Sequence, residues 1–229
     1  MLSFVELGKG EQTVVFLHGW AKKKEDYSEL LELLAKHFKV YALDLPGFGQ
    51  SAISRAYSLD DYADDVAGFM KENKISGAVF VGHSFGGRVA IKLAVRRPEL
   101  VSKLVLIDSG GIERKTLKVK LLQVLAALTP TRLKELVRPM VGSRDYLQSV
   151  GLVRETMKKV VAENLENILP TVGQPTLLIW GEGDHTTPLW QGKLMHELIK
   201  NSQFKVIAGD HGIPYRKAKE VANIICSWL

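Results

Sequence analysis

The sequence has only one cysteine, Cys226, among its 229 residues. A single cysteine cannot form a disulfide within the chain, so the fold cannot depend on an oxidising compartment. Long apolar runs are missing as well, because no stretch approaches the roughly 18 consecutive apolar residues of a membrane-spanning helix. The first residues also lack the basic run and apolar stretch of a secretory signal. Together these absences predict a cytoplasmic protein that is not stably inserted in a membrane.

Patterns that bind metal ions, nucleotides or nucleic acids are absent too. No two histidines stand four residues apart, and one cysteine rules out thiolate clusters, so we expect no metal site. Residues 44–49 could be mistaken for a phosphate-binding loop, but they lack its Gly-Lys-Ser/Thr ending. The basic residues are not interleaved with aromatic ones, which argues against nucleic acid as a partner. The sequence therefore predicts no cofactor and no metal.

The chain carries a formal net charge of +6, and most of this excess lies in one segment. Residues 112–170 contain eleven Lys or Arg against six Asp or Glu. Solvated helix faces explain such an excess without any partner, whereas attraction of an anionic partner would give it a function. Both interpretations stay open at the level of the sequence.

Short apolar segments alternate with helical patterns along most of the chain. Hydrophobic residues make up 46% of the sequence, which suffices for the core of one sizeable domain. Near-continuous apolar strands indicate burial on both faces, so the pattern predicts an α/β fold with a doubly wound, mostly parallel sheet between helix layers. The expected strands are 13–17, 39–43, 77–81, 103–107, 176–180 and 204–207, and the expected helices are 27–36, 59–72 (with Ser58 as N-cap), 85–97, 189–199 and 218–228.

The alternation stops between about residues 110 and 171, where only helical patterns occur. We interpret this stretch as an inserted helical cap. The predicted division is a core formed by residues 1–110 and 171–229 and a cap, or lid, formed by 111–170. A helix that starts near Arg114 would present a broad apolar face, which packs on the domain beneath it or covers an acyl chain.

The strongest chemical signal is the pentapeptide Gly82-His83-Ser84-Phe85-Gly86, placed between a predicted strand and a predicted helix. A G-x-S-x-G pattern alone is weak, but a sharp strand-to-helix turn lifts its serine above the sheet and leaves no room for side chains at the two glycines. We therefore expect Ser84 to be a nucleophile. His83 is expected to turn away from the serine hydroxyl and to serve packing or hydrogen bonding.

A serine hydroxyl needs a base within hydrogen-bond reach and an acid that orients the base. Asp184 and His211 each follow a predicted strand, and the carboxyl ends of parallel strands meet at one edge of the sheet. The sequence thus predicts a catalytic triad of Ser84, Asp184 and His211. Asp108 also ends a strand and is the alternative acid, whereas Asp210 is expected to be an ordinary loop residue.

Cleavage of an acyl bond also needs donors for the negative charge that develops on the carbonyl oxygen. The backbone N–H of Phe85, at the start of the helix after the nucleophile, is one expected donor. The backbone N–H of Trp20, in the loop after the first predicted parallel strand, is the second. These two amides would form the oxyanion hole.

Taken together, four motifs resemble the α/β-hydrolase superfamily over essentially the whole chain. They occur in that family's order and at its usual spacing, and they are His18-Gly19-Trp20, Asp44-Leu45-Pro46-Gly47-Phe48-Gly49-Gln50-Ser51, Gly82-His83-Ser84-Phe85-Gly86-Gly87 and Gly181-Glu182-Gly183-Asp184-His185-Thr186-Thr187-Pro188. Within that superfamily the chain resembles small bacterial carboxylesterases, including the methyl-ester esterases that act on acyl-carrier-protein conjugates in biotin synthesis. This resemblance implies a helical cap over the active site and no cofactor.

Compared with that family, the stretch before Thr13 is short. We therefore expect one or both of the leading antiparallel strands to be reduced or missing. The histidine also has an unusual setting, because Asp210 precedes it where the family often has glycine, and Pro214 follows three places on instead of two. The assignment of His211 as the base rests on its position after the last strand.

The expected function is hydrolysis of a small-molecule carboxylic ester through an acyl-enzyme on Ser84. Four alternatives within the same fold remain: cleavage of a carbon–carbon bond, a lactone or a thioester, and perhydrolysis. A methyl-ester esterase acting on an acidic acyl carrier protein would use the basic excess of the cap for electrostatic steering. The non-enzymatic alternative is a ligand receptor that keeps the triad as a relic. The oligomeric state does not follow from the sequence.

Overall fold

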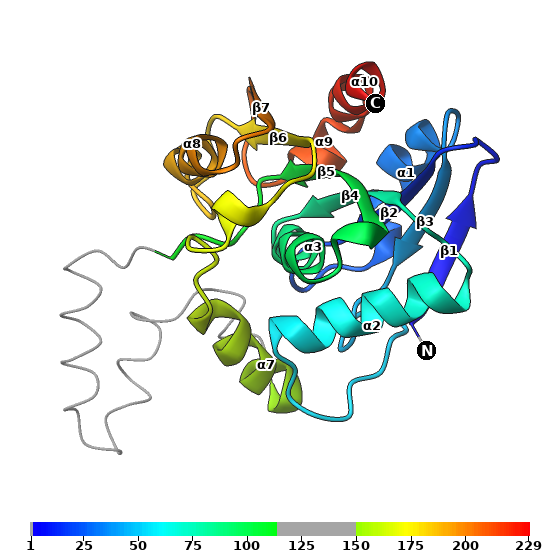
Figure 1. The fold of residues 1–229 in the computed structure, drawn as a ribbon, viewed down its shortest axis with the longest axis vertical. Helices are drawn as coiled ribbons and strands as arrows, with labels where there is room; N and C mark the ends of the chain where they lie inside the picture. Colours follow the sequence, from blue (N-terminus) through cyan, green and yellow to red (C-terminus); the bar gives the residue numbers. More distant parts are fainter. Residues whose placement is uncertain (1, 114–149) are drawn as a thin grey trace, which may run out of the picture.

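The computed structural model describes residues 2–113 and 150–229. The expected cap helix near Arg114, and the rest of the cap up to residue 149, lie outside the described residues. Seven strands form one sheet in the order β1-β3-β2-β4-β5-β6-β7 (Figure 1). Their bounds are β1 Phe4–Leu7, β2 Thr13–Leu17, β3 Lys39–Leu43, β4 Ala78–His83, β5 Val101–Ile107, β6 Thr176–Gly181 and β7 Ser202–Ile207.

The sheet is mostly parallel, as the sequence predicts. Only β1 runs antiparallel to its neighbour, β3, and every other pairing is parallel. One leading antiparallel strand is therefore present among the described residues, and it is only four residues long. The predicted parallel strands are confirmed, although β4 extends two residues further toward the serine than expected.

Helices cover both faces of the sheet, which confirms the doubly wound architecture. The longer helices are α1 Ser28–Leu34, α2 Leu59–Glu72, α3 Phe85–Arg96, α7 Gly151–Ala162, α8 Leu189–Leu198 and α10 Ala218–Trp228, and α9 Ile213–Arg216 is a single turn. Short 3₁₀ helices are η1 Lys24–Tyr27, η2 Pro98–Leu100 and η4 Leu169–Thr171. In Figure 1, α2 and α3 lie on one side of the sheet, and α1 and α10 lie on the other.

The strands are buried on both faces because each face has its own apolar core. Along β2, Val15 and Leu17 belong to the core that includes α2, α3 and α8. Val14 and Phe16 belong to the core that includes α1 and α10. Successive side chains of a strand point to opposite faces, so a fully apolar strand is what two helix layers require.

Local signals in the sequence fix where α2 begins. Ser58 accepts a hydrogen bond from the Asp61 amide at 3.2 Å, and the Asp61 carboxylate accepts one from the Ser58 amide at 2.7 Å. This reciprocal arrangement is a capping box, in which two otherwise unpaired donors of the first turn are satisfied. The prediction that Ser58 caps this helix is confirmed.

The segment between β5 and β6 returns to the core through α7. Tyr57 donates its amide hydrogen to the Thr156 hydroxyl at 3.0 Å, and the Lys159 ammonium donates to the Ala56 carbonyl at 3.0 Å. The described part of the insert therefore docks on the loop that precedes α2. Within residues 2–113 and 150–229, no helix has the length and apolar character needed to cross a membrane.

The base of the insert is held by Arg88 of α3, a side chain that is almost fully buried. Its guanidinium donates to the carbonyl oxygens of Val160 and Glu163 at 3.0 and 2.9 Å, and it pairs with the Glu113 carboxylate at 2.5 Å. Lys92, one turn further along α3, pairs with the Glu163 carboxylate at 2.6 Å. One buried cation thus holds chain that lies before residue 114 and chain that lies after residue 149.

Candidate active site

Ser84 stands on the turn between β4 and α3 in a conformation that side chains seldom adopt. Its φ is +50° and its ψ is −109°. A Cβ added at Gly82 would lie 2.6 Å from the Gly86 carbonyl oxygen, and one added at Gly86 would lie 2.1 Å from the Leu17 carbonyl oxygen. Only glycine fits at these two positions, so the turn is as tight as the pentapeptide predicts. Ser84 itself is partly exposed.

The structure brings together the three side chains that the sequence predicts as a triad. The Ser84 hydroxyl lies 2.9 Å from Nε2 of His211, and Nδ1 of His211 lies 2.7 Å from Oδ2 of Asp184. A carboxylate can only accept, so Nδ1 carries the proton and Nε2 is left as an acceptor for the serine hydroxyl. This is the arrangement in which an imidazole can take a proton from the serine.

Asp184 is buried and receives hydrogen bonds on both of its oxygens. Its Oδ1 accepts from the amides of Thr186 and Thr187 at 2.7 and 3.0 Å, and its Oδ2 accepts from the Thr187 hydroxyl at 2.6 Å. Burial alone would raise the pKa of this carboxyl, but the hydrogen bonds from His211 and Thr187 outweigh it and lower the pKa below its ordinary value. Asp184 is therefore the ionised partner of His211.

Asp108, the alternative acid, sits in the neighbouring loop in a different state. One oxygen accepts the Gly181 amide hydrogen at 2.8 Å, and the other has no hydrogen-bond partner. Burial, with the nearby Asp184 charge, raises the pKa of Asp108 to about 8. This carboxyl is neutral at pH 7, and the acid in hydrogen-bond contact with His211 is Asp184.

The two amides predicted as oxyanion donors lie on neighbouring segments. The Phe85 amide is the first of α3, and amides in a first helical turn have no acceptor within the helix. Trp20 belongs to the loop after β2, and its ring packs edge-on against the rings of Phe85 and Phe48 at centroid distances of 5.1 and 4.9 Å. This packing keeps the Trp20 loop beside the start of α3.

A buried ion pair holds this loop and was not anticipated from the sequence. The Lys24 ammonium lies 2.5 Å from Oδ2 of Asp44, and the Lys24 amide donates to Oδ1 at 3.0 Å. Nε2 of His18 accepts the Leu45 amide hydrogen at 2.9 Å. Residues 44–45 and the Trp20 loop are therefore joined by side chains, and His18 braces the loop as expected. Lysines usually remain solvated, so no sequence pattern pointed to Lys24.

The other two residues weighed as candidates point away from the serine. Asp210, next to His211 in sequence, forms an exposed ion pair with Arg216. His83 is buried, and its ring nitrogens contact Tyr27 and the main chain of His211. Burial, together with the neighbouring His211, lowers the pKa of His83 well below its ordinary value, so this ring is neutral. These placements agree with the roles expected for both residues.

Among residues 2–113 and 150–229, one cluster has ligand atoms close enough to share a metal ion. His83, Asp108 and His211 offer atoms that lie within 4.8 Å of one another. All four ring nitrogens of the two histidines already take part in hydrogen bonds. A metal ion bound there would have to break the link between His211 and Ser84 or Asp184.

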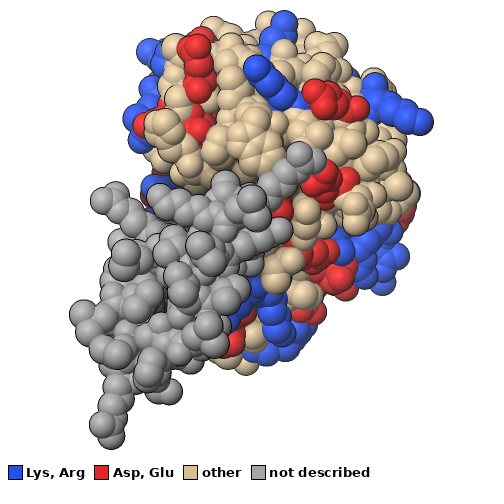
Figure 2. Space-filling model, turned by 90° about the vertical axis from the view of Figure 1, so that its left-hand side faces the viewer, with Lys and Arg blue, Asp and Glu red and all other residues tan. Residues whose placement is uncertain are grey.

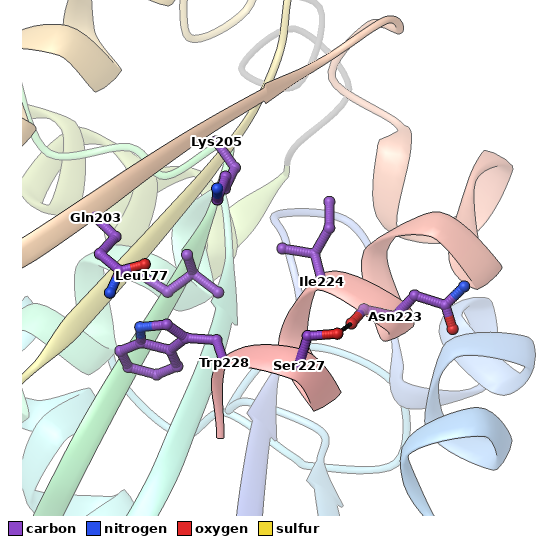
Figure 3. A pocket seen from close by; sticks show the side chains of 7 residues that line it. All are labelled: Leu177, Gln203, Lys205, Asn223, Ile224, Ser227 and Trp228. Carbon is purple, nitrogen blue, oxygen red and sulfur yellow. Dashed lines mark hydrogen bonds between the residues drawn. The ribbon is translucent and has the colours of Figure 1, made fainter.

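A groove of about 590 Å³ lies away from these residues, between the sheet edge and the last helix. Figure 3 shows the side chains that line it, and none of them belongs to the predicted triad or oxyanion hole: Leu177, Gln203, Lys205, Asn223, Ile224, Ser227 and Trp228. No group of acid, base and nucleophile occurs among these seven residues. The chemistry suited to acyl transfer is therefore found at the Ser84 turn and not in this groove.

Known proteins resemble this chain in sequence and in architecture. The uncharacterized hydrolase YugF of Bacillus subtilis (strain 168) is 26% identical over 251 residues, covering 96% of this chain and 90% of the relative. The pimeloyl-[acyl-carrier protein] methyl ester esterase of Nitrosomonas europaea is 30% identical over 217 residues, covering 83% of this chain and 84% of the relative. The crystal structure of the enol-lactonase from Burkholderia xenovorans LB400 superposes with a TM-score of 0.80 at 20% identity, covering 99% of this chain and 95% of that structure.

Residues 12–145, more than half of the chain, match the family described as alpha/beta hydrolase fold. The sheet order, the serine turn and the helices on both faces are consistent with that match. The resemblance inferred from four short motifs is confirmed by these independent comparisons. The chain belongs to the α/β-hydrolase fold family.

Proposed function

We propose that this protein is a serine esterase that hydrolyses a carboxylic ester through an acyl-enzyme on Ser84. One observation carries the proposal: the contacts of 2.9 Å from Ser84 to His211 and 2.7 Å from His211 to Asp184 link nucleophile, base and acid in series. Relatives named as hydrolases and as methyl ester esterases support the same reaction class.

In the first step the Ser84 hydroxyl attacks the ester carbonyl carbon while its proton passes to Nε2 of His211. The Asp184 carboxylate stabilises the imidazolium that forms, and the amides of Phe85 and Trp20 donate to the oxyanion. When the intermediate collapses, the carbon–oxygen bond to the alcohol breaks and His211 returns the proton to the departing alcohol. The acyl group remains on Ser84.

In the second step a water molecule attacks the acyl-enzyme. His211 takes a proton from the water, and the new oxyanion uses the same two amides. Collapse releases the carboxylic acid, and the proton on His211 returns to Ser84. Neither step of this proposed reaction uses a metal ion or a cofactor.

The test is hydrolysis of p-nitrophenyl esters of graded acyl-chain length by the wild type and by Ser84→Ala. We expect the variant to lose at least about a thousandfold in kcat, the scale of single deletions in catalytic triads. The chain-length series would separate preferences for short and long acyl groups. Retention of the wild-type rate by Ser84→Ala would overturn the proposal, and failure of a fluorophosphonate probe to label Ser84 would favour a non-enzymatic receptor.

The proposed division of the chain places the reaction under the insert. We assign residues 1–110 and 171–229 to the catalytic core and residues 111–170 to a cap. The described contacts support this division: Val153 of α7 lies against the loop that contains Gly47, since a Cβ added at Gly47 would be 3.4 Å from a methyl group of Val153. That loop also carries Phe48, whose ring packs on Trp20.

A methyl-ester esterase acting on an acyl-carrier-protein conjugate is the second candidate. Two relatives carry the name pimeloyl-[acyl-carrier protein] methyl ester esterase and align over most of this chain. The basic excess of residues 112–170 would steer an acidic carrier toward the site. On the described part of the face in Figure 2, however, acidic and basic side chains are interspersed.

Salt dependence distinguishes this candidate from a small-molecule esterase. With an acyl-carrier-protein methyl ester as substrate, kcat/KM should fall at least about tenfold between low and high salt, because surface attraction is screened. With the methyl ester of the free acid, kcat/KM should change little over the same range. Equal salt dependence for both substrates would argue against carrier recognition.

A further inference from the structure

A chain of buried polar contacts runs beneath the proposed triad and joins two of its loops. The Gly19 amide lies 3.0 Å from the Tyr27 hydroxyl, which lies 2.7 Å from Nδ1 of His83. Nε2 of His83 lies 2.9 Å from the main-chain oxygen of His211. Tyr27 and His83 are each only 1% exposed, so water does not compete for these contacts.

Elementary hydrogen-bond chemistry determines which atom donates and which accepts in each contact of this series. A carbonyl oxygen can only accept, so Nε2 of His83 carries a hydrogen and donates to His211. His83 is neutral, and its Nδ1 must therefore accept from the Tyr27 hydroxyl. The Tyr27 oxygen is then left to accept from the Gly19 amide. Burial raises the pKa of Tyr27, so its hydroxyl keeps the hydrogen that it donates.

At one end, the series of contacts reaches the loop that carries the Trp20 amide. The Gly19 carbonyl accepts from Nδ1 of His18 at 2.7 Å and from the Lys22 amide at 3.2 Å. Because the peptide bond between Gly19 and Trp20 is planar and trans, these two bonds also set the direction of the Trp20 N–H. The bond from Gly19 to Tyr27 fixes the preceding peptide plane.

At the other end, the same contacts hold the main chain from which the His211 ring extends. His83 donates to the carbonyl of His211, and the two rings lie 4.9 Å apart between centroids. Gly19 also packs closely on the His83 ring, since a Cβ added at Gly19 would lie 2.8 Å from Nδ1 of His83. Tyr27 and His83 thus join the two loops through consecutive hydrogen bonds.

We propose that Tyr27 and His83 are positioning residues that couple the loop of the Trp20 amide to the loop of His211. They keep the oxyanion donor and the base at fixed positions relative to each other. Neither side chain touches the reacting atoms. The inference rests on the proposed function and extends it, because it adds a second set of hydrogen bonds to the triad. It also gives a role to the buried histidine inside the serine turn.

The first test compares Tyr27→Phe with Tyr215→Phe on the p-nitrophenyl ester that the wild type hydrolyses fastest. Tyr215 is a matched control, because its ring packs edge-on against the rings of Tyr27 and His83 at 5.8 and 6.3 Å while its hydroxyl lies outside the chain of contacts. We expect Tyr27→Phe to lose about tenfold or more in kcat with KM changed less than about threefold, since losing a whole oxyanion donor costs about a hundredfold or more. Tyr215→Phe should stay within about twofold.

Each outcome decides between positioning and general packing. The inference would be overturned if the kcat of Tyr27→Phe lay within twofold of the Tyr215→Phe value, whatever the size of the loss. That result would leave the proposed esterase activity intact. A change confined to KM would also overturn it. Wild-type activity in Ser84→Ala would instead refute the proposed function, and the two failures are therefore distinguishable.

Nitrogen-15 NMR of the histidine rings tests the contacts without any activity measurement. In the wild type, the His83 signals should show a neutral ring with hydrogen on Nε2 at every pH between about 6 and 9. The signals are assigned by their absence in His83→Gln. A ring that titrates in this range, or one with hydrogen on Nδ1, would contradict the directions derived above and overturn the inference even if Tyr27→Phe failed to fold.

Discussion

Two neighbouring loops at the same edge of the sheet each hold a buried aspartate, yet the two carboxyls are in opposite states. Asp184, after β6, receives hydrogen bonds on both oxygens from Thr186, Thr187 and His211, and its pKa is lowered. Asp108, after β5, has one bonded and one unpaired oxygen, and burial raises its pKa to about 8. Both carboxyls are buried, and burial raises the pKa of each. At Asp184 the hydrogen bonds from His211 and Thr187 outweigh burial, whereas at Asp108 burial prevails.

The comparison also shows how one hydroxyl is shared between the two loops. The Thr187 oxygen lies 2.6 Å from Oδ2 of Asp184 and 3.0 Å from the main-chain oxygen of Asp108. A hydroxyl has one hydrogen to donate, and the shorter contact to the charged acceptor is the stronger one. The Thr187 hydroxyl therefore donates its hydrogen to Asp184 and stabilises the ionised form of that carboxyl. Three substitutions test this difference.

Asp184→Asn should have the largest effect. An amide cannot stabilise the imidazolium, and it can present a donor where His211 needs an acceptor, so we expect kcat to fall about a thousandfold or more. Steady-state kinetics on a p-nitrophenyl ester measures the loss. Asp210→Asn, which alters the acid next to His211 in sequence, is the control and should stay within about threefold. If Asp184→Asn keeps activity within about tenfold of the wild type, Asp108 is the functional acid.

Thr187→Val should have an intermediate effect. The substitution removes the hydroxyl donor from Asp184 and keeps the shape of the side chain, so the pKa of Asp184 rises and kcat falls about threefold to tenfold. Asp184 supports the reaction when ionised, so the loss of activity on acidification should begin at a higher pH than in the wild type. The measurement is the pH dependence of kcat between about 4 and 7. Thr186→Val is the matched control, since Thr186 donates to Asp184 through its amide, which the substitution keeps. An unchanged acid limb in Thr187→Val would contradict the proposed donor role.

Asp108→Asn should change activity least, within about threefold, and should change stability instead. In the folded protein Asp108 holds its proton up to a pH of about 8, whereas the ordinary carboxyl releases it near 3.8. Between these values the folded state binds more protons, so this group destabilises the wild type increasingly as the pH rises. Asparagine cannot ionise and escapes this penalty.

Urea unfolding at pH 5 and pH 8.5 measures that difference. The free energy of unfolding of Asp108→Asn, relative to the wild type, should increase by about 1 kcal/mol or more from the lower to the higher pH. A pH-independent difference between the two proteins would mean that Asp108 is already ionised in the folded state.

Much of the fold and the arrangement of the site could be predicted from the sequence because the signals are local. The apolar strands, the cap at Ser58 and the glycines around Ser84 each act over a few residues, and the structure confirms them. The meeting of Ser84, Asp184 and His211 followed from a single rule, that parallel strands end at one edge. Their catalytic roles stay a prediction until tested.

The supporting contacts could not be predicted, because they join residues whose types suggest other roles. From the sequence, Lys24 would be taken for a surface lysine and Tyr27 for the start of a helix. In the structure both are buried, and they contact Asp44 and His83, which lie far along the chain. Thr187 is one of several small polar residues in its loop. The periodicity of apolar residues indicates which face of a helix or strand is apolar. It carries no information on which polar side chains come into contact when they stand about 20 to 60 residues apart in the sequence.

Arg88 gives the insert an anchorage that is independent of the sheet edge where the proposed chemistry takes place. Because its guanidinium bonds to Glu113 and also to Val160 and Glu163, the chain after β5 and the end of α7 are held at one point of the core. An insert held at its base in this way can differ in length or composition from one relative to another without shifting the strands below.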